Sequence, residues 1–242
     1  MIEIRHPSTA ATDTRTAYDA IYSDAGLTLQ DDSFFAWVIE LCQPQRGRRV
    51  LDVCCGLGTS LSIARRYGLE PVGVDFSRPA IQHAQQHGAA WVGDAEQLPV
   101  ATASFDYVIN LGSLEHLEDM AQGVREMARV LKPDGKCVVM VPNTFGHFWT
   151  IWYAGLTGEV FDDGQPLQRY GTSQQWKRLL EANGLQVQEI LPYELPPPRT
   201  LRQWATYLRK PKRYLPKLLG KYYLPVHLAS MFVFRCTRGG GG

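Results

Sequence analysis

The chain has 242 residues, 45% of them hydrophobic, and a formal net charge of +1. This suffices for one domain with a substantial core, and no run reaches the roughly 18 apolar residues that a membrane span needs. The N-terminus lacks the apolar region of a secretory signal, and the five cysteines include no C-x-x-C pair. We therefore expect a reduced, cytoplasmic protein without a disulfide framework.

The first predicted elements are helices over residues 14–42, interrupted by Gly26, which would cap the domain. From Arg49 to Pro142, short apolar runs alternate with amphipathic helices, a pattern typical of a parallel sheet with helices on both faces. The expected strands are Arg49–Val53, Val72–Asp75, Ala89–Val92, Phe105–Leu111 and Lys136–Val141. The expected helices between them are Ser60–Tyr67, Arg78–His87 and Asp119–Leu131, and a turn over Lys132–Gly135 precedes the fifth strand.

The pattern changes after Pro142. Residues 143–171 are rich in aromatic residues and glycine, and we expect them to cover a site for an apolar or ring-bearing acceptor, although part of this insert belongs to the core. A helix is predicted over Ser173–Asn183, with Thr172 or Ser173 as its N-cap and Gly184 after its last turn. Leu185–Leu191 and Met231–Cys236 are the last predicted strands, and residues 239–242 read as a glycine linker.

The charge is unevenly distributed. Residues 1–194 carry 15 basic and 24 acidic side chains, a net charge of −9, whereas the rest of the chain carries ten basic and no acidic side chains. Most of these bases alternate with aromatic and leucine residues in 199–224, a stretch predicted to be helical. Three interpretations of this stretch are open: a surface that binds the periphery of a membrane, a binding site for an anionic or lipid-linked acceptor, and a solvated helix face. The acidic remainder and the absence of a recognised motif argue against nucleic acid as a partner.

The first predicted strand ends in a glycine-rich turn, Cys54-Cys55-Gly56-Leu57-Gly58. Glycine lets the backbone turn tightly and approach a ligand at the carboxyl end of a strand. Asp75 ends the next strand, where a carboxylate can accept both hydroxyls of a ribose. Asp94 follows the third strand, where it can accept the amino group of an adenine. Together with Asp52, these acids predict a site for an adenine nucleoside, unless they cap the helices that follow.

Leu51–Gly58 resembles the first motif of class I S-adenosylmethionine-dependent methyltransferases, and three later segments resemble further motifs in order. These segments are Asp75-Phe76-Ser77, Gly93–Pro99 with Ser104-Phe105-Asp106, and Arg129–Gly135. The resemblance spans residues 48–142 and is closest to the small-molecule, methyltransferase type 11-like branch. It implies one domain over 1–238, with a Rossmann-like sheet of seven strands, mostly parallel, the last one antiparallel. The implied cofactor is S-adenosylmethionine, with S-adenosylhomocysteine as product.

The resemblance also implies which residues bind the cofactor. The residues of the first strand and its turn would face the methionine end of the cofactor. The residues after the second and third strands would hold its ribose and its adenine. The residues that end the fourth strand would touch its amino-acid portion. In chain order they are Asp52, Cys54, Gly56, Gly58, Asp75, Phe76, Asp94, Ala95, Asn110 and Leu111.

One residue departs from the family motif, because Cys54 stands at the position of the family's first glycine. Its Cβ would crowd the cofactor or change the turn, unless Cys54 adopts the extended backbone that any small residue tolerates. A dinucleotide site is disfavoured, because Leu61 occupies the third small position of that fingerprint. A Walker-type phosphate loop is not found in the sequence.

Methyl transfer from a sulfonium depends on proximity and orientation, and it needs a base only where the acceptor loses a proton. His116, just after the fourth strand, is the candidate base, with a structural role for the Glu115-His116 pair as the alternative. The candidate acceptor-binding residues are Tyr22, His147, Trp149 and Tyr153. Related enzymes bind a metal through E-x-x-E-H, but Gly112 occupies the first glutamate position, so we expect no metal.

The sequence thus predicts methyl transfer to a small-molecule acceptor, with a hydroxyl chosen by analogy. Three alternatives remain: a methyltransferase for a lipid-linked acceptor at a membrane surface, a non-catalytic subunit that binds the cofactor, and an aminopropyltransferase on the same fold. The last would need a further acid cluster in the fourth-strand motif, which the sequence lacks. The oligomeric state is not predicted.

Overall fold

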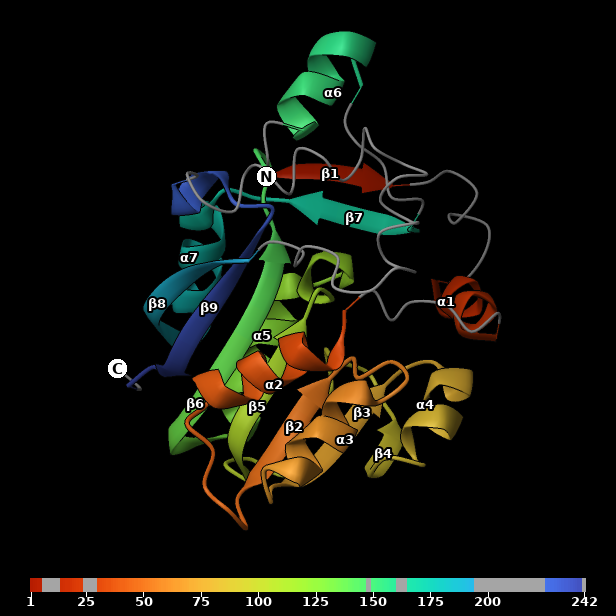
Figure 1. Ribbon diagram of the computed structural model, residues 1–242, viewed down its shortest axis with the longest axis vertical. Helices are drawn as coiled ribbons and strands as arrows, with labels where there is room; N and C mark the ends of the chain where they lie inside the picture. Colours follow the sequence, from red (N-terminus) through yellow and green to blue (C-terminus); the bar gives the residue numbers. More distant parts are fainter. Residues whose placement is uncertain (6–13, 24–29, 147–148, 160–164, 194–224, 241–242) are drawn as a thin grey trace.

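The computed structural model describes residues 1–5, 14–23, 30–146, 149–159, 165–193 and 225–240. At its centre lies a seven-stranded sheet with the strand order β4-β3-β2-β5-β6-β9-β8 (Figure 1). Its strands are β2 (Arg49–Val53), β3 (Glu70–Asp75), β4 (Ala89–Val92), β5 (Phe105–Leu111), β6 (Leu131–Pro142), β8 (Leu185–Tyr193) and β9 (Met231–Arg238). β2 to β6 are parallel, and β9 runs antiparallel to both of its neighbours. The predicted sheet is therefore confirmed.

Helices cover both faces of the sheet, because successive strand residues point to opposite sides. Leu51 and Val53 belong to the core beneath α5 (Met120–Val130) and α7 (Ser173–Ala182). Val50, the residue before Leu51, belongs to the core beneath α2 (Asp32–Leu41) and α3 (Thr59–Arg66). The α4 helix (Arg78–Ala84) packs beside β3 and β4.

Side-chain caps explain where several helices begin. Asp31 accepts hydrogen bonds at the start of α2, Ser77 caps α4 and Asp119 caps α5. Thr172 forms the predicted cap of α7, completed as a capping box by Gln175. The α4 helix ends at Ala84, before the predicted His87, because the amides of Gln86 and His87 bond to the carbonyls three residues back, those of His83 and Ala84.

The turn predicted over Lys132–Gly135 lies inside β6 as an irregularity. Phe105 pairs with Leu131, and Tyr107 pairs next with Lys136, so the intervening residues bulge from the ladder. The prediction located the turn correctly but placed the start of the strand too late.

The sequence did not predict a second, two-stranded sheet. In it, β1 (Ile2–Arg5) pairs antiparallel with β7 (Leu167–Tyr170), which belongs to the aromatic insert. This sheet lies across the carboxyl end of the central strands, and α6 (Trp149–Thr157) stands beyond it (Figure 1). The stretch 199–224, the side chains of several insert aromatics and the end of the glycine run fall outside the described residues. Among the described helices, none combines the length and apolar character needed to cross a bilayer.

Candidate cofactor and acceptor site

The turn from β2 into α3 has three residues with left-handed backbone: Cys54 (φ +64°), Gly56 (φ +50°) and Gly58 (φ +80°). The alternative in which Cys54 is extended is therefore wrong. The amides of Cys54 and Cys55 both donate to the Val74 carbonyl, at 2.7 and 3.1 Å, which holds the chain in this tight conformation. Cys54 thus occupies a position that glycine would occupy without steric cost.

This strained position yields a stability prediction. Cys54→Gly removes the Cβ that disfavours left-handed backbone, whereas Cys54→Ala keeps it, and both remove the thiol. We expect the glycine variant to have a free energy of unfolding about 1 kcal/mol higher than that of the alanine variant. Denaturant unfolding of the two proteins measures this difference. Equal stabilities would show that the Cβ carries no cost in this turn.

Asp75 connects the glycine turn to the end of β3. One carboxylate oxygen accepts the amide of Gly56 at 2.9 Å, and the other accepts the amide of Ser77 at 2.9 Å. The residue is only 3% exposed, and burial raises the pKa of its carboxyl. The N-cap of the following helix is Ser77, so capping is not the role of Asp75. A carboxylate has about four lone-pair sites, so two amides leave acceptor capacity for a ligand.

Asp52 in β2 and Asp94 after β4 lie on either side of β3, in different environments. Asp52 is buried and accepts a hydrogen bond from the Ser60 hydroxyl in the first turn of α3. Burial raises the pKa of Asp52 to about 7. Asp94 is exposed and accepts the amide of Glu96 at 2.8 Å, so it organises its own loop. Ala95 beside it is buried.

Asn110 supplies the clearest sign that a ligand belongs here. The side chain is fully buried, and its amide donates to the Val53 carbonyl at 3.0 Å, which joins the ends of β5 and β2. Its Oδ1 is buried without a hydrogen-bond partner among the described residues. Such a group is costly unless a donor reaches it. An amino-acid ammonium is a suitable donor, so these residues fit S-adenosylmethionine.

The α1 helix (Thr14–Ser23) contributes two tyrosines to this edge. The Tyr18 ring lies 5.3 Å from the Phe76 ring and 6.2 Å from the His116 ring, and its hydroxyl donates to Gln165 at 2.9 Å. The Tyr22 hydroxyl would lie 3.0 Å from a Cβ added at Gly56. Burial, and to a lesser extent the Asp75 carboxylate, raise the pKa of Tyr22. The structure therefore places Tyr22 against the cofactor turn, although the sequence grouped it with the acceptor residues.

His116 ends the short 3₁₀ helix η2 (Leu114–His116) that follows β5. Its Nδ1 lies within hydrogen-bonding distance of the Leu167 carbonyl in β7. A carbonyl only accepts, so in the neutral ring Nδ1 carries the proton and Nε2 is the basic nitrogen. Nε2 lies 3.9 Å from an oxygen of the buried Glu115 carboxylate.

Strand β7 also holds this loop through Arg169, a residue that sequence reasoning missed. Arg169 is buried, pairs with Glu3 at 2.7 Å and donates to the Leu117 carbonyl. Ser60 and Gln165 were missed as well. Ser60 could have been recognised from its position in the first helical turn after the glycines. Gln165 and Arg169 could not, because only the fold brings them to the site.

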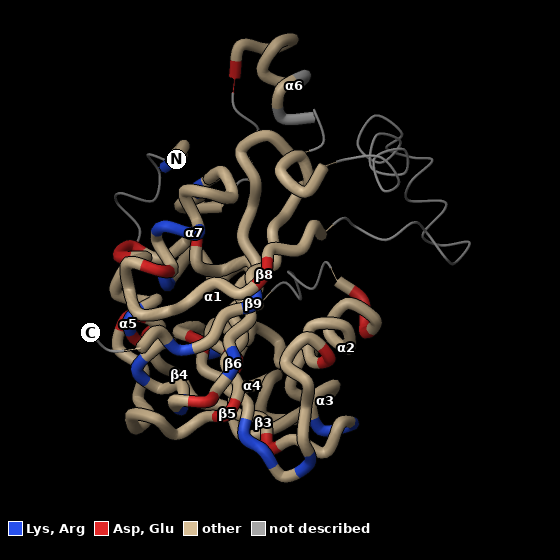
Figure 2. Tube along the Cα trace, turned by 90° about the vertical axis from the view of Figure 1, so that its left-hand side faces the viewer, with Lys and Arg blue, Asp and Glu red and all other residues tan. Residues whose placement is uncertain are grey.

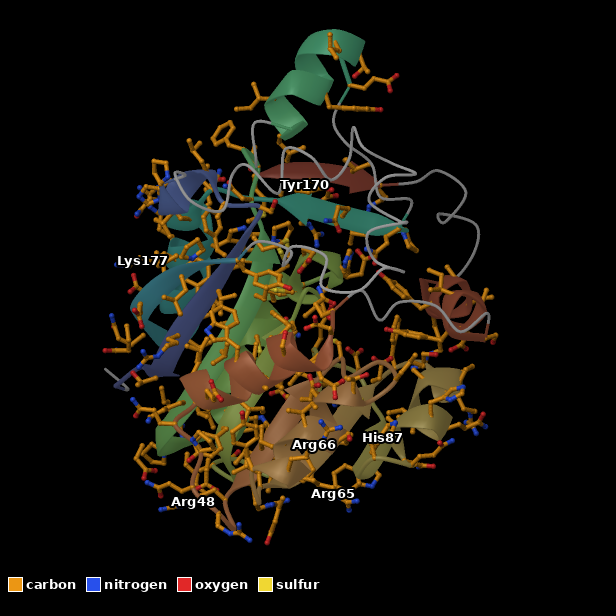
Figure 3. All side chains as sticks on the ribbon, in the orientation of Figure 1. Arg48, Arg65, Arg66, His87, Tyr170 and Lys177 are labelled. Atoms are coloured by element: carbon orange, nitrogen blue, oxygen red, sulfur yellow. The ribbon has the colours of Figure 1, made fainter. Side chains whose placement is uncertain are left out.

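The other predicted residues are only partly described. His147 and the side chain of Trp149 lie outside the described residues, and Tyr153 lies on α6, beyond β7. Figure 3 shows Tyr170 of β7 at the site end of the sheet and Arg48, Arg65 and Arg66 at the opposite end. Within the described ranges, no three His, Cys, Asp or Glu residues form a group suited to a metal ion.

The chain matches the model of the methyltransferase domain family over residues 30–190. This is more than half of its length, so the chain belongs to that family. Its fold is the class I, Rossmann-like fold of S-adenosylmethionine-dependent methyltransferases, and S-adenosylmethionine is the cofactor that this family implies.

Curated relatives match only part of the chain. Ajmaline N-methyltransferase of Rauvolfia serpentina is 32% identical over 106 residues, which are 40% of this chain and 36% of the relative. Demethylmenaquinone methyltransferase of Listeria welshimeri is 38% identical over 109 residues, 40% of this chain and 46% of the relative. The chain therefore spans less than half the length of these relatives.

Solved structures match almost the whole chain. The cyclase SpnF has a TM-score of 0.67 at 19% identity and covers 98% of this chain and 99% of its own. A chain from the complex of the Haloferax volcanii Trm112 methyltransferase activator has a TM-score of 0.65 at 18% identity and covers 95% and 98%. At these identities the likeness shows the fold alone.

Proposed function

We propose that this chain transfers the methyl group of S-adenosylmethionine to a hydroxyl of an apolar or ring-bearing small molecule, with His116 as the base. The observation that carries the proposal is the environment of His116 at the carboxyl edge of the sheet. Two partly matching relatives are named for ajmaline and demethylmenaquinone, which supports a small-molecule acceptor.

The cofactor, when bound, supplies a methyl group already activated by its sulfonium. Asp75 would accept the ribose hydroxyls while it keeps the Gly56 turn in place, and Asn110 Oδ1 would accept a proton of the ammonium group. Phe76 and Asp94 would face the adenine. These residues orient the cofactor, so the protein contributes mainly proximity and alignment.

His116 would take the proton that a hydroxyl acceptor loses. The bond from Nδ1 to the Leu167 carbonyl fixes the tautomer and the ring orientation, and the Glu115 carboxylate stabilises the imidazolium that forms. An acceptor that keeps its protons would not need this arrangement. The arrangement therefore favours a hydroxyl over other acceptor groups.

His116→Ala tests this role. We expect a fall in turnover of about 10²- to 10⁴-fold, with cofactor affinity nearly unchanged, because general base catalysis contributes about that factor. The measurement is formation of S-adenosylhomocysteine with a panel of hydroxyl and amine acceptors. His83→Ala, on the exposed side of α4, is the matched control and should retain full activity. Full activity of the His116 variant would assign the histidine to structure alone.

A non-catalytic, cofactor-binding subunit is the second candidate, because Cys54, with its left-handed backbone, stands where the family motif has its first glycine. Calorimetric titration with S-adenosylmethionine, S-adenosylhomocysteine and NAD, followed by the acceptor panel, separates the two. Binding of both sulfur ligands with turnover on an acceptor supports the enzyme. Binding without turnover on any acceptor supports the subunit, and no binding contradicts both.

A further inference from the structure

The α6 helix and the loop before it form an exposed apolar surface beyond β7, away from the cofactor turn. Leu156 is 64%, Ile151 46% and Phe145 43% exposed. No Lys, Arg, Asp or Glu occurs from Asn143 to Gly158. Figures 1 and 2 both show α6 standing apart from the rest of the molecule, and Figure 1 shows that it lies beyond β1 and β7.

A short helix that exposes apolar side chains to water has little stability by itself. The α6 helix is only nine residues long, and isolated helices shorter than about 12–15 residues are marginally stable. Apolar groups gathered on a surface normally mark a place where something binds. The segment also contains two tryptophans and a tyrosine, residues enriched where membrane meets water.

The distribution of apolar residues around α6 favours a lipid surface over a protein groove. Ile151 and Leu156 are five positions apart, which separates them by about 140° around a helix of 3.6 residues per turn. A protein groove accepts one stripe of a helix. The interfacial region of a bilayer can surround the end of a helix on more than one side.

Charge complementarity indicates which lipids are involved. Residues 199–224 contain eight Lys or Arg and no acidic residue. The described chain leaves for this segment after Tyr193, which pairs with Met231, and Met231 in turn pairs with Pro142 at the start of the loop to α6. Asn143 ties that loop to the returning chain by donating to the carbonyls of His227 and Ala229, at 2.9 and 2.7 Å.

The apolar helix and the basic segment therefore depart from the same corner of the sheet. Other exposed bases, such as Arg65 and Arg66, lie at the opposite end of the molecule (Figure 3). We propose that α6 docks on a bilayer containing anionic lipid and that Phe145, Ile151 and Leu156 enter its interfacial region. The negative headgroups would attract the Lys and Arg residues of 199–224.

Vesicle sedimentation of the full chain tests the proposal. We expect binding to vesicles of phosphatidylcholine with phosphatidylserine, weaker binding to phosphatidylcholine alone, and a decrease with salt as the attraction is screened. The Ile151→Asp/Leu156→Asp double variant should lose at least about tenfold in vesicle affinity, because charged groups resist entry into the bilayer. Trp91→Asp is the matched control: Trp91 is an exposed aromatic on β4, 45% exposed, and its replacement should leave binding unchanged.

Several outcomes would overturn the proposal. These are no sedimentation of the wild type at low salt, a double variant that binds like the wild type, and a control that loses binding equally. A double variant that changes the oligomeric state by light scattering instead would assign α6 to a second copy of the chain. Titration with S-adenosylhomocysteine should be the same for all three proteins, and because sedimentation uses no cofactor, its result is independent of the methyl-transfer proposal.

Discussion

Replacing Asp75 with alanine is expected to weaken the binding of S-adenosylmethionine and S-adenosylhomocysteine by about 1–3 kcal/mol, roughly 5- to 150-fold. The variant loses the carboxylate proposed to accept the ribose hydroxyls, and it frees the amides of Gly56 and Ser77 that this carboxylate now holds. Calorimetric titration with S-adenosylhomocysteine measures the effect.

The matched control is Asp134→Ala. Asp134 is an exposed carboxylate in the bulge of β6, far along the strand from the site, and its loss should leave the affinity unchanged. The affinity of Asp75→Asn should lie between those of Asp75→Ala and Asp134→Ala, because asparagine keeps one acceptor oxygen and loses the charge. Wild-type affinity in a folded Asp75→Ala protein would exclude the ribose role.

Gly58→Ala is expected to lower the free energy of unfolding by roughly 2–5 kcal/mol and to abolish measurable cofactor binding. An added Cβ would lie 2.7 Å from the Ala84 Cα and 2.8 Å from its Cβ, at a backbone φ of +80°. The glycine turn and α4 would therefore have to separate, and this displaces the turn that faces the cofactor.

Gly47→Ala separates the two causes of the expected loss of stability, which are the left-handed backbone and the close contact with Ala84. Gly47 has nearly the same backbone, with φ +77°, but nothing lies within 4 Å of an added Cβ. It should lose only about 1–2 kcal/mol, the cost of left-handed backbone for a side chain. Denaturant unfolding of both variants gives the comparison. If Gly58→Ala were no less stable than Gly47→Ala, close packing against Ala84 would not be the reason for this glycine.

The site combines features that could and could not be predicted from the sequence. Asp52, Asp75 and Asn110 each lie within the last two residues of a strand. Parallel strands bring their carboxyl ends to one edge, so the proximity of these residues followed from the pattern. The left-handed conformation of Cys54 did not follow, because it results from two amides sharing the Val74 carbonyl of the neighbouring strand. A sequence shows a residue type but not the dihedral that its neighbours impose.

The sheet of β1 and β7 shows the same limit at a larger scale. Each strand has four residues, and its hydrogen bonds come from a segment about 160 positions away, so neither has a local signal strong enough to be recognised. Yet this small sheet holds the His116 loop, through the Leu167 carbonyl and Arg169. The contacts that orient the proposed base therefore could not be anticipated.

The sequence by itself determined the order of the strands and helices of the central sheet, the glycine turn and the family, and it narrowed the cap of α7 to Thr172 or Ser173. These depend on periodicity and on turn residues that are neighbours in the chain. Only the tertiary structure decided that Asn110 Oδ1 is buried without a partner among the described residues, that Arg169 holds the His116 loop, and that α6 stands exposed beyond β7. Each of these depends on which distant segments pack together, and long-range packing leaves no fixed spacing in the sequence.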